Sequence, residues 1–454
     1  RRLQIPVKKG DNENDLLSFH LFLVIIMRYQ TLFAACLALL VASCTEPPKK
    51  ESTALETGAA ETEAQLVARA LAIHDRVLTM DTHADTPLRM IEPGFDMSVR
   101  HDPNESGSKV DYPRMIEGGL DSIFFATFVA QNIRDDEGDS RAKALAMQMI
   151  DATIESTLEN ADTVGLALTP DDAIELERQG KRAVYIAMEN GYPIGSDLAN
   201  VEVFYDKGVR YITLVHSTNN DLADSSTDSK GPEHEGLSQF GEEVVKEMNR
   251  LGIMIDVSHA SDDVFYDTIA LSEAPIIATH SNARAVTEHK RNMSDDMITT
   301  IAEHGGVVQV TMYSGYLRAA PGNPKRDAAI AAARANMKPP SEMTDDDRAA
   351  MRETLNEINQ AFPDPLATVQ HAVDHIDYIV SLVGIDHVGI GCDFDGGGGI
   401  EGVFDASEVM NITIELVRRG YTEEEIGKIW SGNVLRVFRE VQALAEQKAT
   451  KAAI

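Results

Sequence analysis

The chain has 454 residues, of which 43% are hydrophobic and 25% charged, an ordinary balance for a globular protein with a sizeable core. Its formal net charge of −32 argues against nucleic acid or an anionic membrane surface as a partner, because both are bound through basic patches. The length would allow two or three average domains, but α/β barrels routinely exceed about 250 residues as one unit.

The N-terminal part predicts an export signal. We expect residues 1–26 to be an upstream translation artefact, with the true start at Met27. Residues 27–43 resemble a bacterial lipoprotein signal peptide, with an apolar stretch and small residues before Cys44, which would be diacylated. The apolar run is too short for a transmembrane helix, and an ordinary cleaved signal or a short anchor is the alternative. Residues 44–65 have the composition of a flexible tether.

This signal predicts an exported lipoprotein that is membrane-anchored and faces the periplasm. Thr45, in place of an aspartate after the lipidated cysteine, favours the outer membrane. Cys36 would leave with the signal and Cys44 would carry lipid, so Cys392 would be the only thiol of the folded body and no intrachain disulfide could form. The folded domain is expected over residues 66–447, followed by a tail over 448–454.

Apolar runs alternate with helical patterns along this domain. Helices are predicted over 64–78 and 140–161, and a further helical pattern follows Phe240. The apolar runs cover 77–85, 122–129, 184–189, 211–216, 253–258, 276–280, 307–313 and 387–394. Eight strands separated by helices predict an α/β fold of the parallel (β/α)8 barrel type. A doubly wound open sheet is the alternative, although it would bind a ligand at one switch point rather than at many strand ends.

Residues 318–365 interrupt this alternation with a stretch rich in Ala, Asp and Arg, bounded by Pro321 and by Pro339 and Pro340. We expect a helical insertion over the barrel mouth. A lid and simple packing are both open roles for it.

Histidine and acidic side chains end four of the apolar runs. These residues are His83 and Asp85, Glu189, His259 and His280. Two residues that are two apart on a strand point to the same face, so His83 and Asp85 can chelate one ion together. Turn or capping roles are the alternative for any one pair, but four independent strand ends favour a dinuclear site. Three imidazoles and two carboxylates suit zinc, with Glu189 as the bridge.

Three more polar residues lie near predicted strand ends. His216 could donate a hydrogen bond to an oxyanion, with capping as the alternative. Asp393 could exchange a proton with a metal-bound water or a leaving amine, or it could hold a turn with Gly396. Arg291 could bind a substrate carboxylate, or it could be solvated or ion-paired.

Six segments in order carry a resemblance to a known family. They are DTHADTP, MENGYPIG, GVRYITLVHSTNNDLADSS, GLSQFGEEVVKEMNRLGIMIDVSH, PIIATHSNARAVTEHKRN and HVGIGCDFDG. The chain resembles the membrane (renal-type) dipeptidases, zinc enzymes of peptidase family M19, from about residue 70 to 440. The resemblance implies a metal-dependent-hydrolase barrel with two Zn²⁺ ions, one on His83 and Asp85 and one on His259 and His280, with Glu189 bridging.

The same resemblance implies roles for the remaining residues. His216 would contact the tetrahedral intermediate, Arg291 would bind the terminal carboxylate of a dipeptide, and Asp393 would handle the amino group or the proton. Tyr316 would line the same pocket. The first family motif commonly reads Asp-Gly-His-Asn-Asp, whereas Thr82 and Ala84 stand here, so both ligands are kept but the surrounding hydrogen bonds and pocket shape could differ.

We therefore expect a zinc-dependent dipeptidase in which a hydroxide bridging two ions attacks the scissile carbonyl. Another binuclear metal amidohydrolase, such as a deacylase or lactamase, is the first alternative, because surface loops set the leaving group. A non-catalytic lipoprotein that binds metal or peptide is the second. The sequence leaves a homodimer open and does not indicate which dipeptides are preferred.

Overall fold

The computed structural model describes residues 61–103, 107–335 and 344–452, so the predicted signal peptide, Cys44 and most of the predicted tether lie outside the described residues. Helix α2 begins at Glu63, three residues before the domain start predicted at Leu66. Thr62 caps it, because its hydroxyl accepts from the backbone N–H of Gln65 while the Gln65 side chain accepts from the N–H of Thr62. The last helix runs to Ala452 and takes in most of the predicted tail.

The strands form one parallel sheet. They are β1 (Met80–Ala84), β2 (Ser122–Phe128), β3 (Val164–Leu166), β4 (Arg182–Glu189), β5 (Val209–Thr213), β6 (Met254–Asp256), β7 (Ile277–Ala278), β8 (Val307–Val310) and β9 (Val388–Ile390). Eight of them follow the order β1-β2-β4-β5-β6-β7-β8-β9, and β3 pairs with β4 off this path. The Ala84–Phe394 bridge joins the first strand to the segment after the last, so the eight strands form a nearly closed barrel.

This barrel confirms the predicted fold class, and each of its eight strands lies within or overlaps a predicted apolar run. The ninth strand was not predicted. Val164–Leu166 has three residues, contains a glycine and pairs only with the first half of β4, so it lacks the length that identifies a strand in sequence.

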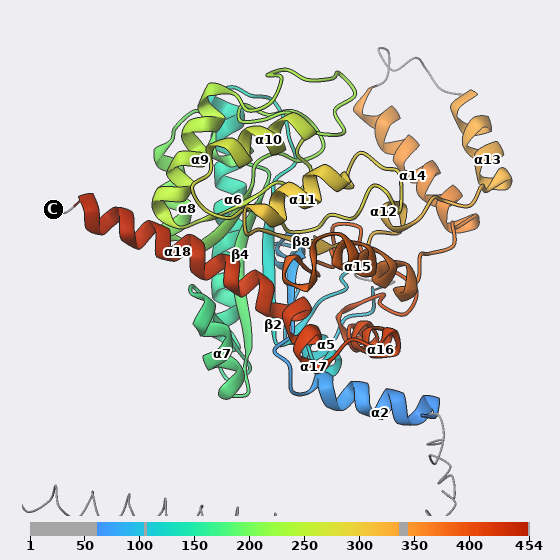
Figure 1. The fold of residues 1–454 in the computed structure, drawn as a ribbon. Helices are drawn as coiled ribbons and strands as arrows, with labels where there is room; N and C mark the ends of the chain where they lie inside the picture. Colours follow the sequence, from blue (N-terminus) through green and yellow to red (C-terminus); the bar gives the residue numbers. More distant parts are fainter. Residues whose placement is uncertain (1–60, 104–106, 336–343, 453–454) are drawn as a thin grey trace, which may run out of the picture. The chain divides into compact units, whose positions relative to one another are not determined.

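Helices surround the barrel (Figure 1). They are α2 (Glu63–His74), α3 (Pro87–Met90), α5 (Tyr112–Gly118), α6 (Asp136–Glu159), α7 (Pro170–Arg178), α8 (Ala199–Asp206), α9 (Gln239–Leu251), α10 (Asp262–Leu271), α11 (Asp295–Glu303), α12 (Ser314–Leu317), α13 (Pro324–Ala335), α14 (Asp345–Ala361), α15 (Val369–Val383), α16 (Met410–Arg419), α17 (Glu423–Gly427) and α18 (Asn433–Ala452). None of the described helices is long and apolar enough to cross a membrane.

Serine residues set the starts of three successive helices. The hydroxyls of Ser238, Ser261 and Ser294 each accept a hydrogen bond from the backbone N–H three residues later, which satisfies a free donor at the start of α9, α10 and α11. Each helix follows a loop that leaves the carboxyl end of β5, β6 or β7, so these caps fix where those loops end.

Aromatic side chains fill the barrel interior below the carboxyl ends of the strands. Phe124 of β2 stacks on Tyr185 of β4 with ring centroids 4.6 Å apart and lies 5.2 Å from Tyr211 of β5, and Phe438 of α18 packs against the first two. Alternate residues of the same strands pack outward against the helices. The aromatic layer closes the interior of the barrel with packed side chains, and polar side chains lie at the carboxyl ends of the strands.

The predicted insertion is helical. Helices α13 and α14 pack on each other and extend from the barrel body beyond α12, in orange in Figure 1. Helix α13 buries none of its residues.

Candidate metal centre

The structure brings the five predicted ligands together at the carboxyl end of the barrel. His83 lies in β1 and Asp85 follows that strand directly, while Glu189 is the last residue of β4. His259 and His280 lie three and two residues beyond the ends of β6 and β7. Parallel strands direct their carboxyl ends to one side of the sheet, so residues spread over nearly 200 positions meet at one point.

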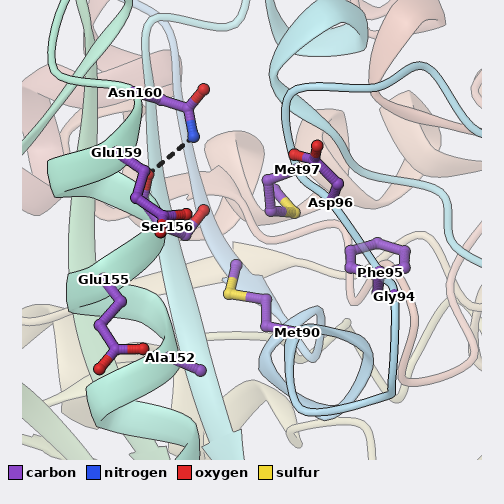
Figure 2. Close-up of a pocket in the computed structure, with 10 residues that line it drawn as sticks. All are labelled: Met90, Gly94, Phe95, Asp96, Met97, Ala152, Glu155, Ser156, Glu159 and Asn160. Carbon is purple, nitrogen blue, oxygen red and sulfur yellow. Dashed lines mark hydrogen bonds between the residues drawn. The ribbon is translucent and has the colours of Figure 1, made fainter.

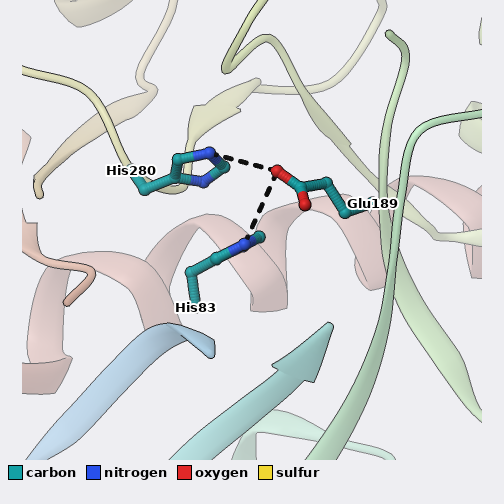
Figure 3. Close-up of side chains that lie close together, drawn as sticks. All are labelled: His83, Glu189 and His280. Carbon is teal, nitrogen blue, oxygen red and sulfur yellow. Dashed lines mark ion pairs between the residues drawn. The ribbon is translucent and has the colours of Figure 1, made fainter. Parts of the chain in front are cut away.

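Glu189 is the centre of the cluster. Its Oε1 atom lies 3.1 Å from His259 Nε2, 3.3 Å from His280 Nε2 and 3.6 Å from His83 Nε2. Figure 3 shows the carboxylate facing the rings of both His83 and His280, whose centroids are 3.9 Å apart. Asp85 Oδ1 lies 3.7 Å from His83 Nε2, and Asp393 lies close to both residues. One carboxylate oxygen therefore faces three imidazole nitrogens.

Burial controls the protonation of these side chains. It lowers the pKa of His83 to about 3 and the pKa values of His259 and His280 well below the usual range, so these imidazoles are neutral and able to act as ligands. Burial also raises the pKa values of Asp85 and Glu189 well above normal, and neighbouring carboxylates raise them further. A cation among these groups would favour neutral imidazoles and ionised carboxylates, and so would offset the free-energy cost of burying them.

Several buried polar atoms of the cluster have no hydrogen-bond partner among the described residues. They are His83 Nε2, Asp85 Oδ1, Glu189 Oε2 and His259 Nδ1. A buried polar atom without a partner costs free energy of about 1–3 kcal/mol, so a run of them at one place indicates a missing ligand. The described residues hold three triplets of potential ligand atoms lying within 4.8 Å of one another. All three include predicted ligands, one of them together with His216 and another with Asp393. Nitrogen and oxygen donors in this number fit divalent zinc.

His216 lies beside the predicted ligands. It follows β5, and its Nε2 atom is 3.8 Å from Glu189 Oε1. Its ring lies 4.1 Å from that of His259 and 4.5 Å from that of Phe128, between centroids. Burial lowers the pKa of His216 to about 3, so the ring is neutral and carries one N–H. This position suits a hydrogen-bond donor at the edge of the ion site.

Asp393 is held in a tight turn after β9. Its φ is +60°, and its backbone N–H donates to the His83 carbonyl at 2.9 Å. Gly396 is required here, because a Cβ at that position would lie 2.1 Å from Asp85 Oδ2 and 2.3 Å from Asp393 Oδ1. Burial raises the pKa of Asp393 to about 7. The turn and the proton-exchange roles considered from the sequence are therefore compatible in one residue.

Arg291 lies beside His280, and not all of its N–H groups have a hydrogen-bond acceptor. Its side chain is buried, Nη2 donates to the His280 carbonyl at 3.1 Å, and buried Nε has no partner. The guanidinium lies 5.4 Å from the ring centroid of Tyr316, which also packs on Tyr313 and His289. A buried arginine without a carboxylate partner suits an anionic group of a substrate.

The sequence interpretation missed three polar residues below the cluster. Tyr211 contacts His83, Thr279 contacts His280, and Asp256 contacts Thr279. Each is a polar residue inside or directly after an apolar run that was expected to be a strand, and this was the available signal. Phe128, which packs on His216, was also missed.

A separate cavity of about 420 Å³ lies between α6 and the segment before Met97 (Figure 2). Its lining includes Asp96, Glu155 and Glu159, and none of the predicted site residues.

Comparisons with known proteins agree with this geometry. The model of a family described as membrane dipeptidase, peptidase family M19, matches residues 67–452. Dipeptidase tcpJ of Claviceps purpurea is 29% identical over 80% of this chain and 77% of its own length. An uncharacterized dipeptidase of Schizosaccharomyces pombe is 30% identical over 82% of each chain. The crystal structure of the probable dipeptidase PvdM of Pseudomonas aeruginosa is 32% identical, covers 84% of this chain and all of its own, and superposes with a TM-score of 0.76.

Proposed function

Because the chain belongs to the membrane dipeptidase family M19 and is a metallo-dipeptidase, we propose that it hydrolyses dipeptides with two zinc ions held by the buried cluster around Glu189. The observation that carries this proposal is the position of Glu189 Oε1, within 3.6 Å of the Nε2 atoms of three neutral histidines. A single carboxylate among three imidazoles is suited to bridge two ions.

The two ions would have different ligands. His83 and Asp85 would hold one ion, His259 and His280 the other, and Glu189 both. Support comes from the buried, unpartnered atoms His83 Nε2, Asp85 Oδ1 and Glu189 Oε2. When bound, the ions would lower the pKa of the attacking water and polarise the scissile carbonyl.

Residues around the ions would orient the substrate. We assign Arg291 to the terminal carboxylate, because its buried guanidinium has an unpartnered Nε and no carboxylate within ion-pair distance in the described residues. Tyr316 would form the wall beside it. Fixing the terminal carboxylate near the ions limits the substrate to two residues, because a longer peptide would place its carboxylate elsewhere.

Two residues would act on the reacting atoms. The N–H of neutral His216 would stabilise the oxyanion, and Asp393 would carry the proton to the leaving amine. A carboxyl group with a pKa raised to about 7 by burial can both accept and release a proton near neutral pH. Asp393 lies beside His83 and Asp85, the residues that would hold the first ion.

Elemental analysis of the purified protein and hydrolysis of a peptide panel test this proposal together. The panel contains L,L- and L,D-dipeptides, a tripeptide, N-acyl amino acids and lactams. About two zincs per chain and cleavage of dipeptides alone would support it, and His83→Ala should lose both. Two zincs without dipeptide cleavage would reject the substrate, and a protein without zinc would reject the metal centre.

We also propose that the protein is anchored through a lipid on Cys44 and faces the periplasm, on the basis of the small residues before this cysteine. Labelling with a radioactive fatty acid in cells tests this proposal. The protein should take up label and fractionate with membranes, whereas Cys44→Ser should do neither. A soluble, unlabelled native protein would contradict it.

A further inference from the structure

In two of the proposed zinc ligands, the ring nitrogen that faces away from Glu189 contacts a hydroxyl group inside the barrel. His83 Nδ1 lies 2.7 Å from the Tyr211 hydroxyl, and His280 Nδ1 lies 2.9 Å from Thr279 Oγ1. All four side chains are at most 1% exposed. Water therefore does not compete for these contacts, and the two hydroxyls determine which ring nitrogen carries the proton.

The hydrogen-bond partners of Tyr211 settle the tautomer of His83. The Tyr211 hydroxyl also lies 3.0 Å from the Thr82 carbonyl, which can only accept a hydrogen bond. The single hydroxyl proton is used there, so the contact with His83 must be donated by Nδ1–H. Nε2 of His83 is then the unprotonated nitrogen, and it faces Glu189.

The same accounting applies to His280. Thr279 Oγ1 donates to Asp256 Oδ2 at 2.7 Å, so its proton is also used and His280 Nδ1–H must be the donor. Hydrogen bonds in turn fix the position of the Asp256 carboxylate. Its other oxygen accepts from the backbone N–H groups of Ser258 and Thr279, both at 2.9 Å, and Thr213 donates a second hydroxyl to Oδ2.

His259 lacks such support. Its Nδ1 atom is buried without a partner, and its backbone has a φ of +68°, in the left-handed region that non-glycine residues rarely adopt. Its ring instead packs against the rings of His216 and His280. Of the two ligands of the second ion, only His280 therefore has its tautomer fixed by hydrogen-bonded side chains. Tyr211 thus contacts the ligand of the first ion and Thr279 with Asp256 contacts the ligand of the second, and the side chains of Tyr211 and Thr279 also interact with each other.

We propose that Tyr211 and the Thr279–Asp256 pair are positioning residues that fix the tautomers of His83 and His280, each for one of the two ions. This inference rests on the proposed dinuclear zinc site. Groups that orient a ligand in this way typically contribute 10- to 100-fold to metal affinity. Loss of either support should weaken the zinc constant of its own position more than the constant of the other position.

Stepwise zinc titration against a competing chelator tests this inference, because it measures two binding constants without using activity. Thr279→Val keeps the shape of the side chain but removes the hydroxyl, and it should weaken the zinc constant of one position about 10- to 100-fold. Thr279→Ser keeps the hydroxyl and should retain both constants. Tyr211→Phe should weaken the other position by a similar factor.

Tyr185→Phe is the matched control. This tyrosine belongs to the same aromatic layer, but its hydroxyl donates to the Thr169 carbonyl and contacts no histidine. It should keep both zinc constants. Thermal unfolding of the metal-free variants separates loss of folding from loss of a support, because Thr279→Val and Thr279→Ser should melt within a few degrees of each other.

Three results would overturn the inference. Zinc constants of Thr279→Val and Tyr211→Phe within about threefold of the original would reject the positioning role while the metal centre stands. An equal loss in Tyr185→Phe or in Thr279→Ser would show that packing, rather than the hydroxyl contact, is responsible. A native protein that binds no zinc would reject the proposed metal centre and this inference with it.

Discussion

The carboxylates of the metal centre and those of the cavity beside α6 differ in their surroundings rather than in their chemistry. Asp85 and Glu189 are at most 4% exposed, and each has an oxygen without a hydrogen-bond partner. Asp96, Glu155 and Glu159 around the cavity of Figure 2 are exposed to water, and hydrogen bonds from Ser98 lower the pKa of Asp96. In this protein, acidic residues therefore indicate an ion site only if they are buried away from water and their oxygens have no hydrogen-bond partner.

The strongest test of this difference exchanges one carboxylate in each region. Glu189→Gln keeps the size of the side chain but removes the charge between the histidines. We expect bound zinc to fall from about two per chain to below one, and kcat/KM for a dipeptide to fall more than about 100-fold. Glu159→Gln, at the rim of the cavity, should keep both values. Equal zinc contents in the two variants would contradict the comparison.

Two buried arginines extend the comparison to cations. Arg291 has an unpartnered Nε, whereas Arg114 pairs with Asp111 and Asp405 and donates to the His101 carbonyl. Arg291→Gln should lower kcat/KM for dipeptides about 10- to 100-fold, mainly through KM, because a charge-assisted pair with the substrate is lost. Its zinc content should not change.

Arg114→Gln serves as the counterpart to that variant. It leaves two buried carboxylates without their cation and should lower the free energy of unfolding by about 3–5 kcal/mol, measured by urea denaturation at neutral pH. Its KM should remain at the original value if the variant is assayed while folded. A rise in KM for Arg114→Gln, or a loss of stability alone for Arg291→Gln, would reverse the two assignments.

His375 shows how a buried group with all its partners responds to pH. Its Nδ1 accepts from the Ala283 N–H and its Nε2–H donates to the Leu317 carbonyl, and burial lowers its pKa to about 4. Because the folded-state pKa lies below the unfolded value, near 6.5, its contribution to stability is complete above about pH 6.5 and is lost as the pH falls toward 4.

Between pH 7 and pH 5 this residue should cost the native protein about 2 kcal/mol of unfolding free energy. His375→Gln cannot titrate, so its unfolding free energy should change less with pH by that amount, although it starts from a lower value. Urea denaturation at the two pH values measures both slopes. Parallel slopes would show that the folded protein does not hold His375 in its neutral form.

The smallest effect is expected for the exposed insertion. Asn323 donates to the Phe362 carbonyl at 3.1 Å, so the ends of the α13–α14 segment are adjacent and a short Gly-Ser linker can replace residues 324–361. The deletion should retain both zinc constants and change the free energy of unfolding by less than about 1 kcal/mol, because α13 buries no residue. A large loss of zinc affinity would show that the insertion supports the metal centre.

Much of the fold and of the site could be predicted because both depend on local patterns. Strand spacing identified His83 and Asp85 as neighbours on one face, and the position of Glu189 at the end of an apolar run placed it at the barrel mouth. Each of these inferences needs only the residues next to the ligand in sequence.

The remaining features depend on contacts between distant segments. Tyr211 is one aromatic residue of an apolar run, and the sequence does not show that its hydroxyl meets His83, 128 residues away. Thr279 and Asp256 are likewise separated by 23 positions. The short strand Val164–Leu166 pairs with Arg182–Val184 of β4, ahead of the residues of β4 that pair with β5, and its own residues do not indicate this.

Anomalous diffraction from crystals at the zinc absorption edge tests the central claim most directly. Two peaks are expected about 3.5 Å apart, one beside His83 and Asp85 and one beside His259 and His280, with Glu189 between them. A single peak, or peaks that leave Glu189 without a contact, would contradict the dinuclear site.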